Sequence, residues 1–498
     1  MYRAAVVLTS FVLAGCAASP AYHPPEVRLP AAFRETLDSV PHVAGSAAAV
    51  SPARPEAVAP DPDEPRDGAG AGDTAIALNT FWRELGDTTL ARLMNEAVGG
   101  NLDVRAAEAR VRGARATRTE VALDLAPTVT FGGGYTRQRL SGATFPIGSG
   151  GFPDQDIWDG GFDAAWELDL FGRVRRNVQA RGAFVAVARE DLRDVRVSLT
   201  AELARAYFDL RGAQEQLLVA QRNAQNQQRT LQVTRQRLEA GRGTAFDTER
   251  AQAQLSFTLA SVPLLESRVA QAHYLIGILV GRPPTVVAGE LAVAASLPAL
   301  PDVGSLGRPD SIILGRPDVA AAERRLAVER ALVGAARAEY LPRLSLGGSA
   351  GYSADRFNSL GDRGTFRYAV GPIISWPALN LGRVKARVDV SRAREDEARA
   401  QYDQSVLRAL QEVEASLALY RTSRARVELI QNAATASERA AELARVRFSG
   451  GVADFLEVLD AERTQLEAQD QLAQGRTEAA TAFAALYRAL GGEWPVSS

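Results

Sequence analysis

Two very long stretches of this chain lack proline, the residue that most reliably ends a helix. Residues 174–240 contain no proline, and residues 384–449 contain neither proline nor glycine. Apolar side chains recur there with the 4-3 spacing of a coiled-coil seam, as at Val406, Leu410 and Val413. At 1.5 Å per residue, each stretch predicts a helix of about 100 Å, several times the thickness of a small domain.

The two long stretches belong to a repeat that spans most of the chain. Residues 166–173 read WELDLFGR, and the tryptophan and the final Gly-Arg return within residues 376–383 (382 − 172 = 210). Farther on, Ala240-Gly241-Arg242 returns as Gly450-Gly451-Val452. A period of this length exceeds that of solenoid repeats. We therefore predict two similar halves, each with the size of a domain.

The N-terminus has the pattern of an export signal. An apolar run over residues 4–13 is followed by Leu13-Ala14-Gly15-Cys16, and Cys16 is the only cysteine of the chain. This motif resembles the lipobox of bacterial lipoproteins, which implies removal of residues 1–15 and S-diacylglycerol and N-acyl groups on Cys16. Ala17, in place of aspartate, implies sorting to the outer membrane. The alternative is a lone buried cysteine.

The composition divides the rest of the chain into five segments. Residues 16–80 are rich in Pro, Ala and Gly and cannot bury enough apolar surface to fold, so we expect a lipidated tether. The first repeat then covers residues 81–282 and the second residues 317–492. A proline-rich linker, residues 283–316, lies between them, and residues 493–498 form a C-terminal tail.

Each half also contains two stretches in which apolar and polar residues alternate. Phe162, Ala164 and Trp166 point one way, whereas Asp163 and Ala165 point the other. Period two predicts a strand, and the aromatic residues fit a strand with one face in lipid and one in water. The remaining three strands show the same alternation at Val129, Phe131 and Tyr135, at Leu344, Leu346 and Tyr352, and at Phe366, Tyr368 and Val370. Loops are predicted at residues 138–155 and 355–364.

Four strands are too few to close a barrel, and an open edge in hydrocarbon leaves backbone groups without partners. Three copies of the chain would supply twelve strands. The alternative is a four-stranded sheet on a soluble domain. The fold class predicted is thus an α+β membrane protein: four strands per chain in a trimeric twelve-stranded barrel, continued by a long coiled-coil helical tunnel with an internal two-fold repeat.

Four shorter helical stretches accompany the two long ones. They cover residues 89–125, 244–280, 317–340 and 452–490. In each half, two of them laid end to end match one long helix in length. This predicts a long helix that leaves a strand, a sharp turn at Gly241 or Gly450, and a return in two pieces. Pro263 should kink its helix.

The motifs together resemble the outer membrane factors, the family of the TolC and OprM channels, and especially their NodT-type lipoprotein branch. The resemblance rests on the lipobox, Leu170-Phe171-Gly172-Arg173, Leu381-Gly382-Arg383 and the segment from Arg447-Phe448 to Glu462-Arg463. It implies a homotrimeric channel in the outer membrane, reaching into the periplasm. Its implied partners are a periplasmic adaptor (membrane fusion) protein and an inner membrane pump of the RND type, and its implied task is export of drugs and other small toxic molecules.

Two acidic residues follow the second glycine turn. Glu457 and Asp460 are three residues apart and therefore share one face of a helix. By resemblance to the acidic constriction of the family, three copies would form a ring of six carboxylates at the periplasmic gate. Such a ring can select cations or respond to pH. The alternative is a solvated face on which Asp460 pairs with Arg463.

Asp247 lies beyond the first glycine turn. It matches an aspartate that some family members latch to a tyrosine and an arginine near the second turn, but Phe448 and Ala453 stand at those two positions. That latch cannot form here. We expect closure of the periplasmic gate to depend on other contacts of Asp247, and the candidate partners are Arg242, Arg445 and Arg447.

The two turns themselves consist of Gly241, Arg242 and Gly243 and of Gly450, Gly451 and Val452. Glycine suits a reversal that needs positive φ and lets a partner backbone come close. Turn geometry alone would explain these residues, whereas the family resemblance implies that they contact the adaptor.

Several other function classes have little support. Two of the three histidines, His23 and His42, fall in the tether and His273 on a helix, so no catalytic triad or metal site can be assembled and no cofactor is expected. With 57 basic and 59 acidic residues, the chain has no net positive charge that would attract nucleic acid. Two alternatives to efflux remain open: a channel for type I protein secretion, and a lipid-anchored periplasmic coiled-coil scaffold without a pore.

Overall fold

The computed structural model describes residues 24–25, 29–30, 32–34, 82, 85–141, 153–302 and 308–492. The predicted signal peptide 1–15, Cys16 and the tail 493–498 lie outside the described residues. The chain divides into two compact units. Unit 1 comprises Met1–Val27, Ala109–Arg189 and Ala320–Gln404, and unit 2 comprises Arg28–Glu108, Glu190–Val319 and Ser405–Ser498.

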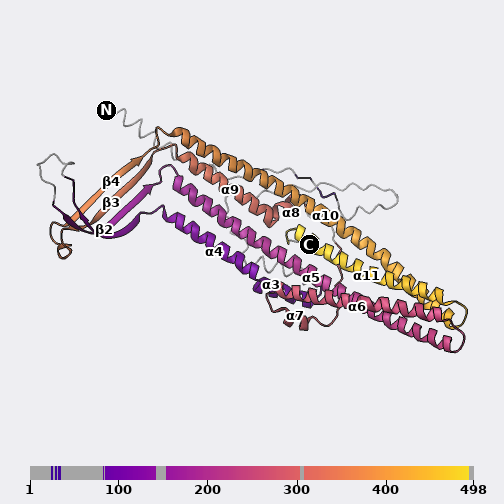
Figure 1. Cartoon of the computed structure of the whole chain (residues 1–498). Helices are drawn as coiled ribbons and strands as arrows, with labels where there is room; N and C mark the ends of the chain where they lie inside the picture. The colour runs from indigo at the N-terminus through magenta and orange to yellow at the C-terminus, as the bar shows by residue number, and fades with distance from the viewer. Residues whose placement is uncertain are drawn as a thin grey trace. The chain divides into compact units, whose positions relative to one another are not determined.

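Unit 1 contains one antiparallel sheet of four strands, which confirms the four strands predicted (Figure 1). The strands are β1 (Thr128–Gln138), β2 (Gln155–Leu168), β3 (Arg343–Ala354) and β4 (Phe366–Ser375), paired in that order. The central pair β2 and β3 comes from different halves of the sequence, with Trp166 opposite Leu346. Within the described residues, the outer strands β1 and β4 each pair along one side only.

Apolar and aromatic side chains of the sheet are exposed in the single chain. The ring of Phe131 lies 5.2 Å from that of Phe162, and those of Tyr352 and Phe366 are 5.6 Å apart. More than half of Phe131, Phe162, Phe366, Tyr368, Val370 and Ile374 is accessible. A face of this kind on a soluble monomer would be a large uncovered apolar patch, so it requires a partner or an apolar solvent.

The two halves fix the ends of their strands with the same contact. The indole N–H of Trp166 donates to the carbonyl of Leu125 at 2.9 Å, and that of Trp376 donates to the carbonyl of Tyr340 at 3.0 Å. Each acceptor lies just beyond a helix, α4 (Leu102–Leu123) or α9 (Pro317–Ala338). Each tryptophan therefore ties the end of one strand to the segment that enters the preceding strand.

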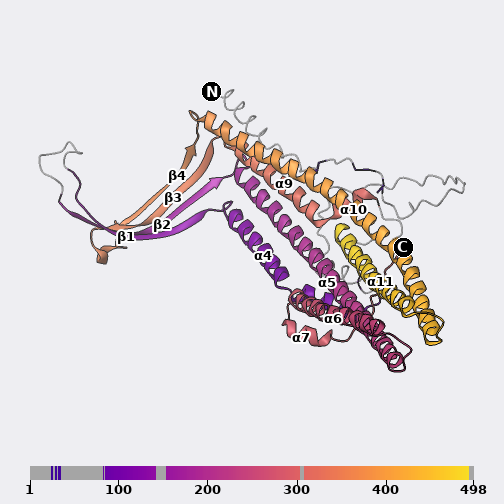
Figure 2. The same ribbon diagram turned by 45° about the vertical axis from the view of Figure 1, so that its right-hand side comes forward.

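The two long helices are present nearly as predicted. They are α5 (Arg173–Glu239) and α10 (Leu381–Ser449). Each turns back into a shorter helix, α6 (Ala245–Leu279) or α11 (Phe455–Ala489), and in both views the two hairpins lie side by side (Figures 1 and 2). α6 continues through Pro263 as one helix. No helix in the described part of the chain combines the length and the apolar character that crossing a bilayer requires.

One predicted helix is in fact two. Residues 89–125 form α3 (Thr88–Gly100) and α4, separated at Asn101, whose backbone is extended. The Asn101 side chain accepts from the amide of Asp103 at 2.8 Å and donates to the carbonyl of Leu279 at 3.0 Å. A Cβ on Gly100 would lie 2.8 Å from the carbonyl oxygen of Val280. The break therefore lets the chain approach the end of α6 closely.

Large aromatic side chains fill the core of unit 2. Trp82 is fully buried, with its ring 4.7 Å from Tyr487 and 6.3 Å from Phe483. The hydroxyl of Tyr207 donates to Asp87 at 2.6 Å, and burial raises the pKa of Tyr207 to about 12. The short helices α7 (Pro284–Glu290) and α8 (Pro309–Gly315) belong to the same unit.

Part of the N-terminal segment is attached to unit 2. Phe33 is buried, and the amide of Arg34 donates to the carboxylate of Glu414 in α10 at 2.8 Å. Residues 16–80 are predicted as a tether, and these contacts hold that segment at one point of its length.

Candidate functional site

The helix hairpins of unit 2 end in two turns with matching backbone geometry. Gly241 has φ +68° and Gly451 has φ +75°, the left-handed region that favours glycine. After each glycine, one amide bonds back across the turn: Arg242 to the carbonyl of Arg237 at 2.8 Å, and Val452 to that of Arg447 at 2.9 Å. The turn predicted at residues 450–452 is confirmed, and Gly451 is its residue with positive φ.

The helices that follow the turns start with equivalent caps. The Thr244 side chain accepts from the amide of Asp247 at 3.2 Å, and the Asp454 side chain accepts from the amide of Glu457 at 3.1 Å. Asp247 and Glu457 hold the third position of their helices, where a carboxylate interacts favourably with the helix dipole. The helix dipole thus gives both acids a local role. Among the described residues, the contacts of Asp247 lie within its own turn at Thr244, and they include none of the three candidate arginines.

A small apolar core joins the two hairpins near the turns. Its buried members come from all four helices: Ala224, Leu231, Ala251, Leu255, Ala444, Phe455 and Val458. Phe448 packs against this core, with its ring 5.7 Å from that of Phe455. Because several members are alanine, the helices approach closely and little apolar area holds them together. Polar contacts therefore have a large share in the stability of this end.

One such contact is made by the buried carboxylate of Glu462, which pairs with an arginine of its own hairpin and bonds to the other hairpin. Glu462 in α11 is 4% exposed and accepts from Arg445 of α10 at 2.9 Å. It also accepts from the hydroxyl of Thr230 in α5 at 2.9 Å, while Arg445 donates to Gln465 at 2.9 Å. The carboxylate thus connects three helices, and removing one partner would leave a buried charge unsatisfied.

A second contact joins the tips themselves. The guanidinium of Arg237, in the last turn of α5, donates to the carbonyl of Phe448 at 2.8 Å. It also lies 4.2 Å from the centroid of the Phe448 ring. From the sequence, Phe448 was noted only because it lacks the hydroxyl of a latch tyrosine, and Arg237 was not predicted to take part. Of the candidate arginines, Arg445 binds Glu462 and Arg447 lies 3.2 Å from Glu457, so neither contacts Asp247.

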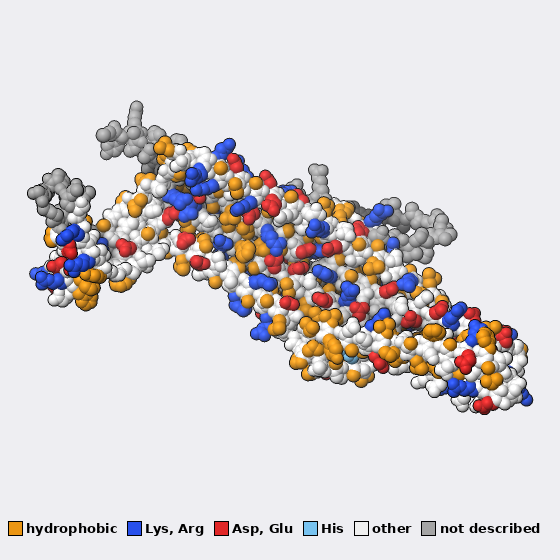
Figure 3. Space-filling view, in the orientation of Figure 1, with side chains coloured by type: hydrophobic (Ala, Val, Ile, Leu, Met, Phe, Trp, Pro, Cys, Tyr) orange, Lys and Arg blue, Asp and Glu red, His pale blue; other side chains and the backbone are white. Residues whose placement is uncertain are grey.

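The two acids predicted for the gate are accessible in the single chain. The side chains of Glu457 and Asp460 are 47% and 73% exposed. Asp460 accepts from Arg463 at 3.0 Å, which is the pairing that the sequence left as an alternative. Figure 3 shows acidic and basic side chains mixed at this end of the hairpins. The ring of six carboxylates stays a prediction, since it requires three copies.

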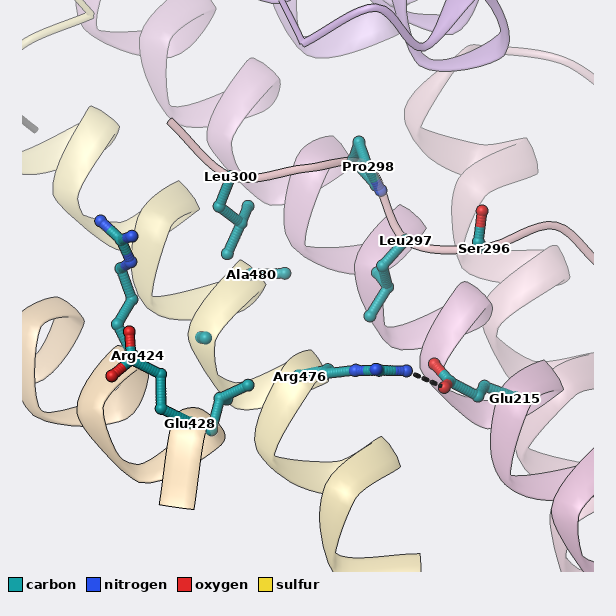
Figure 4. Close-up of a pocket in the computed structure, with 11 residues that line it drawn as sticks. Glu215, Ser296, Leu297, Pro298, Leu300, Arg424, Glu428, Arg476 and Ala480 are labelled. Carbon is teal, nitrogen blue, oxygen red and sulfur yellow. Dashed lines mark hydrogen bonds and ion pairs between the residues drawn. The ribbon is translucent and has the colours of Figure 1, made fainter. Parts of the chain in front are cut away.

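Unit 2 also has surface pockets. One of about 490 Å³ is lined by Leu297, Pro298 and Leu300 of the segment after α7, by Arg424 and Glu428 of α10, and by Arg476 of α11. Figure 4 shows the Arg476 guanidinium directed at Glu215, which it binds at 2.8 Å. A smaller pocket of about 360 Å³ beside the tip includes Thr230, Arg445 and Phe448.

His273 has a structural place. Its Nε2 hydrogen-bonds to the carbonyl of Leu291 at 3.2 Å, which ties α6 to the segment after α7. Burial lowers the pKa of His273, so the ring is neutral at physiological pH. His23 and His42 lie outside the described residues.

Comparisons with known proteins agree with this architecture. A family model described as outer membrane efflux protein matches residues 93–278 and 309–492. The chain is 30% identical over 429 residues to the outer membrane protein OprJ of Pseudomonas aeruginosa, covering 86% of this chain and 89% of OprJ. It is 29% identical over 422 residues to the toluene efflux pump outer membrane protein TtgF of Pseudomonas putida, covering 85% and 86%.

The solved structures give the same result. The outer-membrane channel OprN superimposes with a TM-score of 0.78 at 38% identity, covering 88% of this chain and 99% of that one. Sequence and fold therefore agree over most of the chain, including both hairpins. The chain belongs to the outer membrane efflux protein family, and it is an outer membrane channel protein that extends into the periplasm.

Proposed function

We propose that three copies of the chain form one channel, with a twelve-stranded barrel in the outer membrane and a helical tunnel in the periplasm. The observation that carries this proposal is the sheet: β1 and β4 each leave one edge unpaired, and the aromatic face is exposed. Unpaired strand edges in hydrocarbon cost several kcal/mol per backbone group. Edge-to-edge pairing of β1 with β4 of the next copy removes both edges.

Planar bilayer recording of the purified full-length chain tests this proposal. We expect discrete conductance steps, together with an SDS-resistant trimer that migrates as a monomer after heating. A monomer without conductance would refute the channel and favour the scaffold without a pore.

We further propose that the channel acts with a periplasmic adaptor and an inner membrane pump of the RND type, and that it exports small organic compounds. The names of the relatives support this class of substrate: TtgF belongs to a toluene efflux pump, and SrpC of Pseudomonas putida, 31% identical over 437 residues, to a solvent efflux pump. The turns at Gly241 and Gly451 are the proposed adaptor contacts. Deletion of the gene should sensitise cells to organic solvents, whereas a protein secretion channel would leave solvent tolerance unchanged.

At the tip, we propose that Glu457 and Asp460 of three copies control ion passage. Both side chains are exposed and share the first turns of α11. Six carboxylates around one axis would attract cations and repel anions. Their ion-pair partners, Arg447 and Arg463, are exposed as well, and exposed pairs of this kind are held together only weakly.

Finally, we propose that Cys16 carries the lipid anchor. The motif Leu13-Ala14-Gly15-Cys16 supports it, and several acyl chains together hold a protein on a bilayer where one would be marginal. Mass spectrometry of the mature N-terminus should show acylated Cys16. A Cys16→Ser variant should keep the signal peptide uncleaved, and an unmodified Cys16 in the mature protein would contradict the anchor.

A further inference from the structure

The four places where the chain passes between helix and strand lie together in unit 1. β1 begins at Thr128, opposite Ala165 near the end of β2; Leu168 faces Leu344 at the start of β3; and Arg343 faces Ser375 at the end of β4. The antiparallel register therefore brings all four crossings to one end of the sheet. We call residues 123–128, 166–177, 337–343 and 375–388 the junction collar.

Apolar side chains of the collar are unusually exposed. Leu379 is 99% accessible, Leu123 65%, Trp376 53% and Leu170 52%. They continue the exposed apolar face of the sheet, since Trp376 directly follows β4 and Ile374 within it is also exposed. Water is an unfavourable environment for so exposed a leucine, whereas the edge of a hydrocarbon layer is a favourable one.

Basic side chains follow immediately behind this apolar edge. The collar holds eight basic residues, namely Arg173, Arg175, Arg176, Arg337, Arg343, Arg383, Lys385 and Arg387. It holds four acidic ones, Asp124, Glu167, Asp169 and Glu339. Each chain therefore has an excess of four positive charges here, although the whole chain has a net charge of −2. In Figure 3, basic side chains gather where the helices leave the sheet.

Internal contacts satisfy only part of this charge. Arg173 binds Glu167 at 2.6 Å, Arg175 binds Asp169 at 3.1 Å, and Arg387 binds Glu339 at 2.8 Å. Arg383 and Lys385 are exposed and have no ion-pair partner within the part of the chain that the structure describes. They lie in the first two turns of α10, which begins at Leu381 and has no acidic residue in its first turn.

Helix stability does not explain this placement. The N-terminal end of a helix carries partial positive charge, so a cation there is unfavourable and an anion favourable. α5 repeats the arrangement, with three arginines and no acid in its first turn. Cations grouped at two helix starts suit an external anion such as a phosphate, because they add full positive charges to the positive end of the helix dipole.

We propose that the junction collar docks on the periplasmic leaflet of the outer membrane, with Leu379 and Trp376 in the acyl region and Arg383 and Lys385 bound to the phosphates of anionic phospholipids. This inference rests on the membrane location and the trimeric channel proposed above. The distance along the helix fits this placement. The four residues from Leu381 to Lys385 rise about 6 Å, and a long cationic side chain can span that distance to reach the headgroups. Three copies would place twelve excess positive charges around the channel.

Lys385 offers a direct test, because it is the only lysine of the chain. The full-length protein is reconstituted in vesicles of phosphatidylcholine, with or without phosphatidylglycerol, and labelled with a water-soluble amine reagent. We expect Lys385 to react several-fold more slowly in the anionic vesicles and to recover its reactivity in high salt. Equal rates in both vesicles would overturn the proposal.

A pair of variants tests the same surface by lipid retention. In Arg383→Gln/Lys385→Gln, the amount of phosphatidylglycerol retained after detergent extraction should fall, by about fivefold for each charge removed, since each basic side chain near an anionic surface contributes about 1 kcal/mol. The matched control is Arg394→Gln, an exposed arginine farther along α10, which should retain lipid as the unchanged protein does. Unchanged retention in the double variant, or an equal loss in the control, would overturn the proposal.

Conductance separates this inference from the channel on which it rests. The double variant should still form trimers and conduct in planar bilayers, so that only lipid retention changes. If the unchanged protein neither trimerises nor conducts, the channel proposal fails. If the unchanged protein conducts but its Lys385 reacts at the same rate with and without phosphatidylglycerol, the collar proposal alone fails.

Discussion

The guanidinium of Arg237 lies over the ring of Phe448, 4.2 Å from its centroid, and donates to the carbonyl of the same residue at 2.8 Å. Arg237 lies in the last turn of α5, and Phe448 lies in the last turn of α10. This contact therefore joins the two hairpins at their tips. A cation–π contact and a hydrogen bond to a backbone carbonyl thus connect the two hairpins at Phe448.

Replacing Arg237 should loosen the tip. In Arg237→Lys the charge remains, but a single ammonium cannot both lie flat on the ring and donate in the plane of the carbonyl. We expect conductance of the closed channel in planar bilayers to rise several-fold, with more leakage of large antibiotics into cells. Arg235→Gln is the control, because Arg235 is exposed and bonds to Gln252 of its own hairpin. Equal leakage in both variants would remove Arg237 from the closing contacts.

The repeat and its periodicity predicted most of the fold. Alternation placed the strands, and the absence of proline placed α5 and α10 to within a few residues. The break at Asn101 was missed although Gly99-Gly100-Asn101 signals it. The break is caused by a tertiary contact, since Gly100 lies against the end of α6. The helical pattern continues on both sides of the break and therefore concealed it.

The candidate site was predicted less completely for a related reason. The turns and the exposed acids follow from local patterns, as glycine spacing and the i, i+3 rule show. The contacts of Arg237 with Phe448 and of Thr230 with Glu462 depend on how two hairpins from different halves align. No local signal distinguishes Arg237 from the other arginines that line these helices.

The buried pair of Arg445 and Glu462 should be required for stability. Glu462→Gln keeps the shape of the side chain but leaves the guanidinium without its counter-charge, which we expect to cost about 2 kcal/mol. The apparent Tm of the detergent-solubilised protein should fall accordingly. Glu467→Gln is a suitable control, because Glu467 is 64% exposed and lies 3.9 Å from Arg463. Its Tm should stay unchanged, and a matching drop would show that the pair has no special role.

The two neighbouring glycines of the second turn should respond differently to alanine. Gly451→Ala forces a Cβ into φ +75°, at a cost of about 1 kcal/mol. Gly450→Ala should be neutral, because a Cβ there meets its nearest atom at an ordinary 3.5 Å. Thermal unfolding measures both effects, and Gly241→Ala should behave like Gly451→Ala. Equal melting of the Gly450 and Gly451 variants would contradict the turn geometry.

Asp194 should make unfolding depend on pH. Burial raises its pKa above the ordinary 3.8, with Asp318 adding repulsion and Arg488 and Arg316 opposing it. A carboxyl with a raised pKa holds its proton longer in the folded state. Ionised Asp194 therefore lowers the free energy of unfolding. This loss is absent below the ordinary pKa and grows as the pH rises through the folded-state pKa.

Asp194→Asn should consequently raise the apparent Tm at pH 7 and change little at pH 3. Melting curves of the variant and the unchanged protein across that range measure the difference. Glu249→Gln, at an exposed carboxyl of α6, is the control and should leave the profile as it is. A Tm gain that is the same at both pH values would exclude charge burial as the cause.

The acidic residues beyond the second turn should determine which ions pass. Glu457→Gln/Asp460→Asn removes six negative charges from a trimer with little change of shape, so cation preference should fall toward none and closed-state conductance should change. The reversal potential in a salt gradient across a planar bilayer gives the selectivity directly. Glu467→Gln/Glu438→Gln removes the same number of exposed charges elsewhere on α10 and α11 and should preserve it. A reversal potential unaffected in the first variant would mean that Glu457 and Asp460 serve only as partners for Arg447 and Arg463.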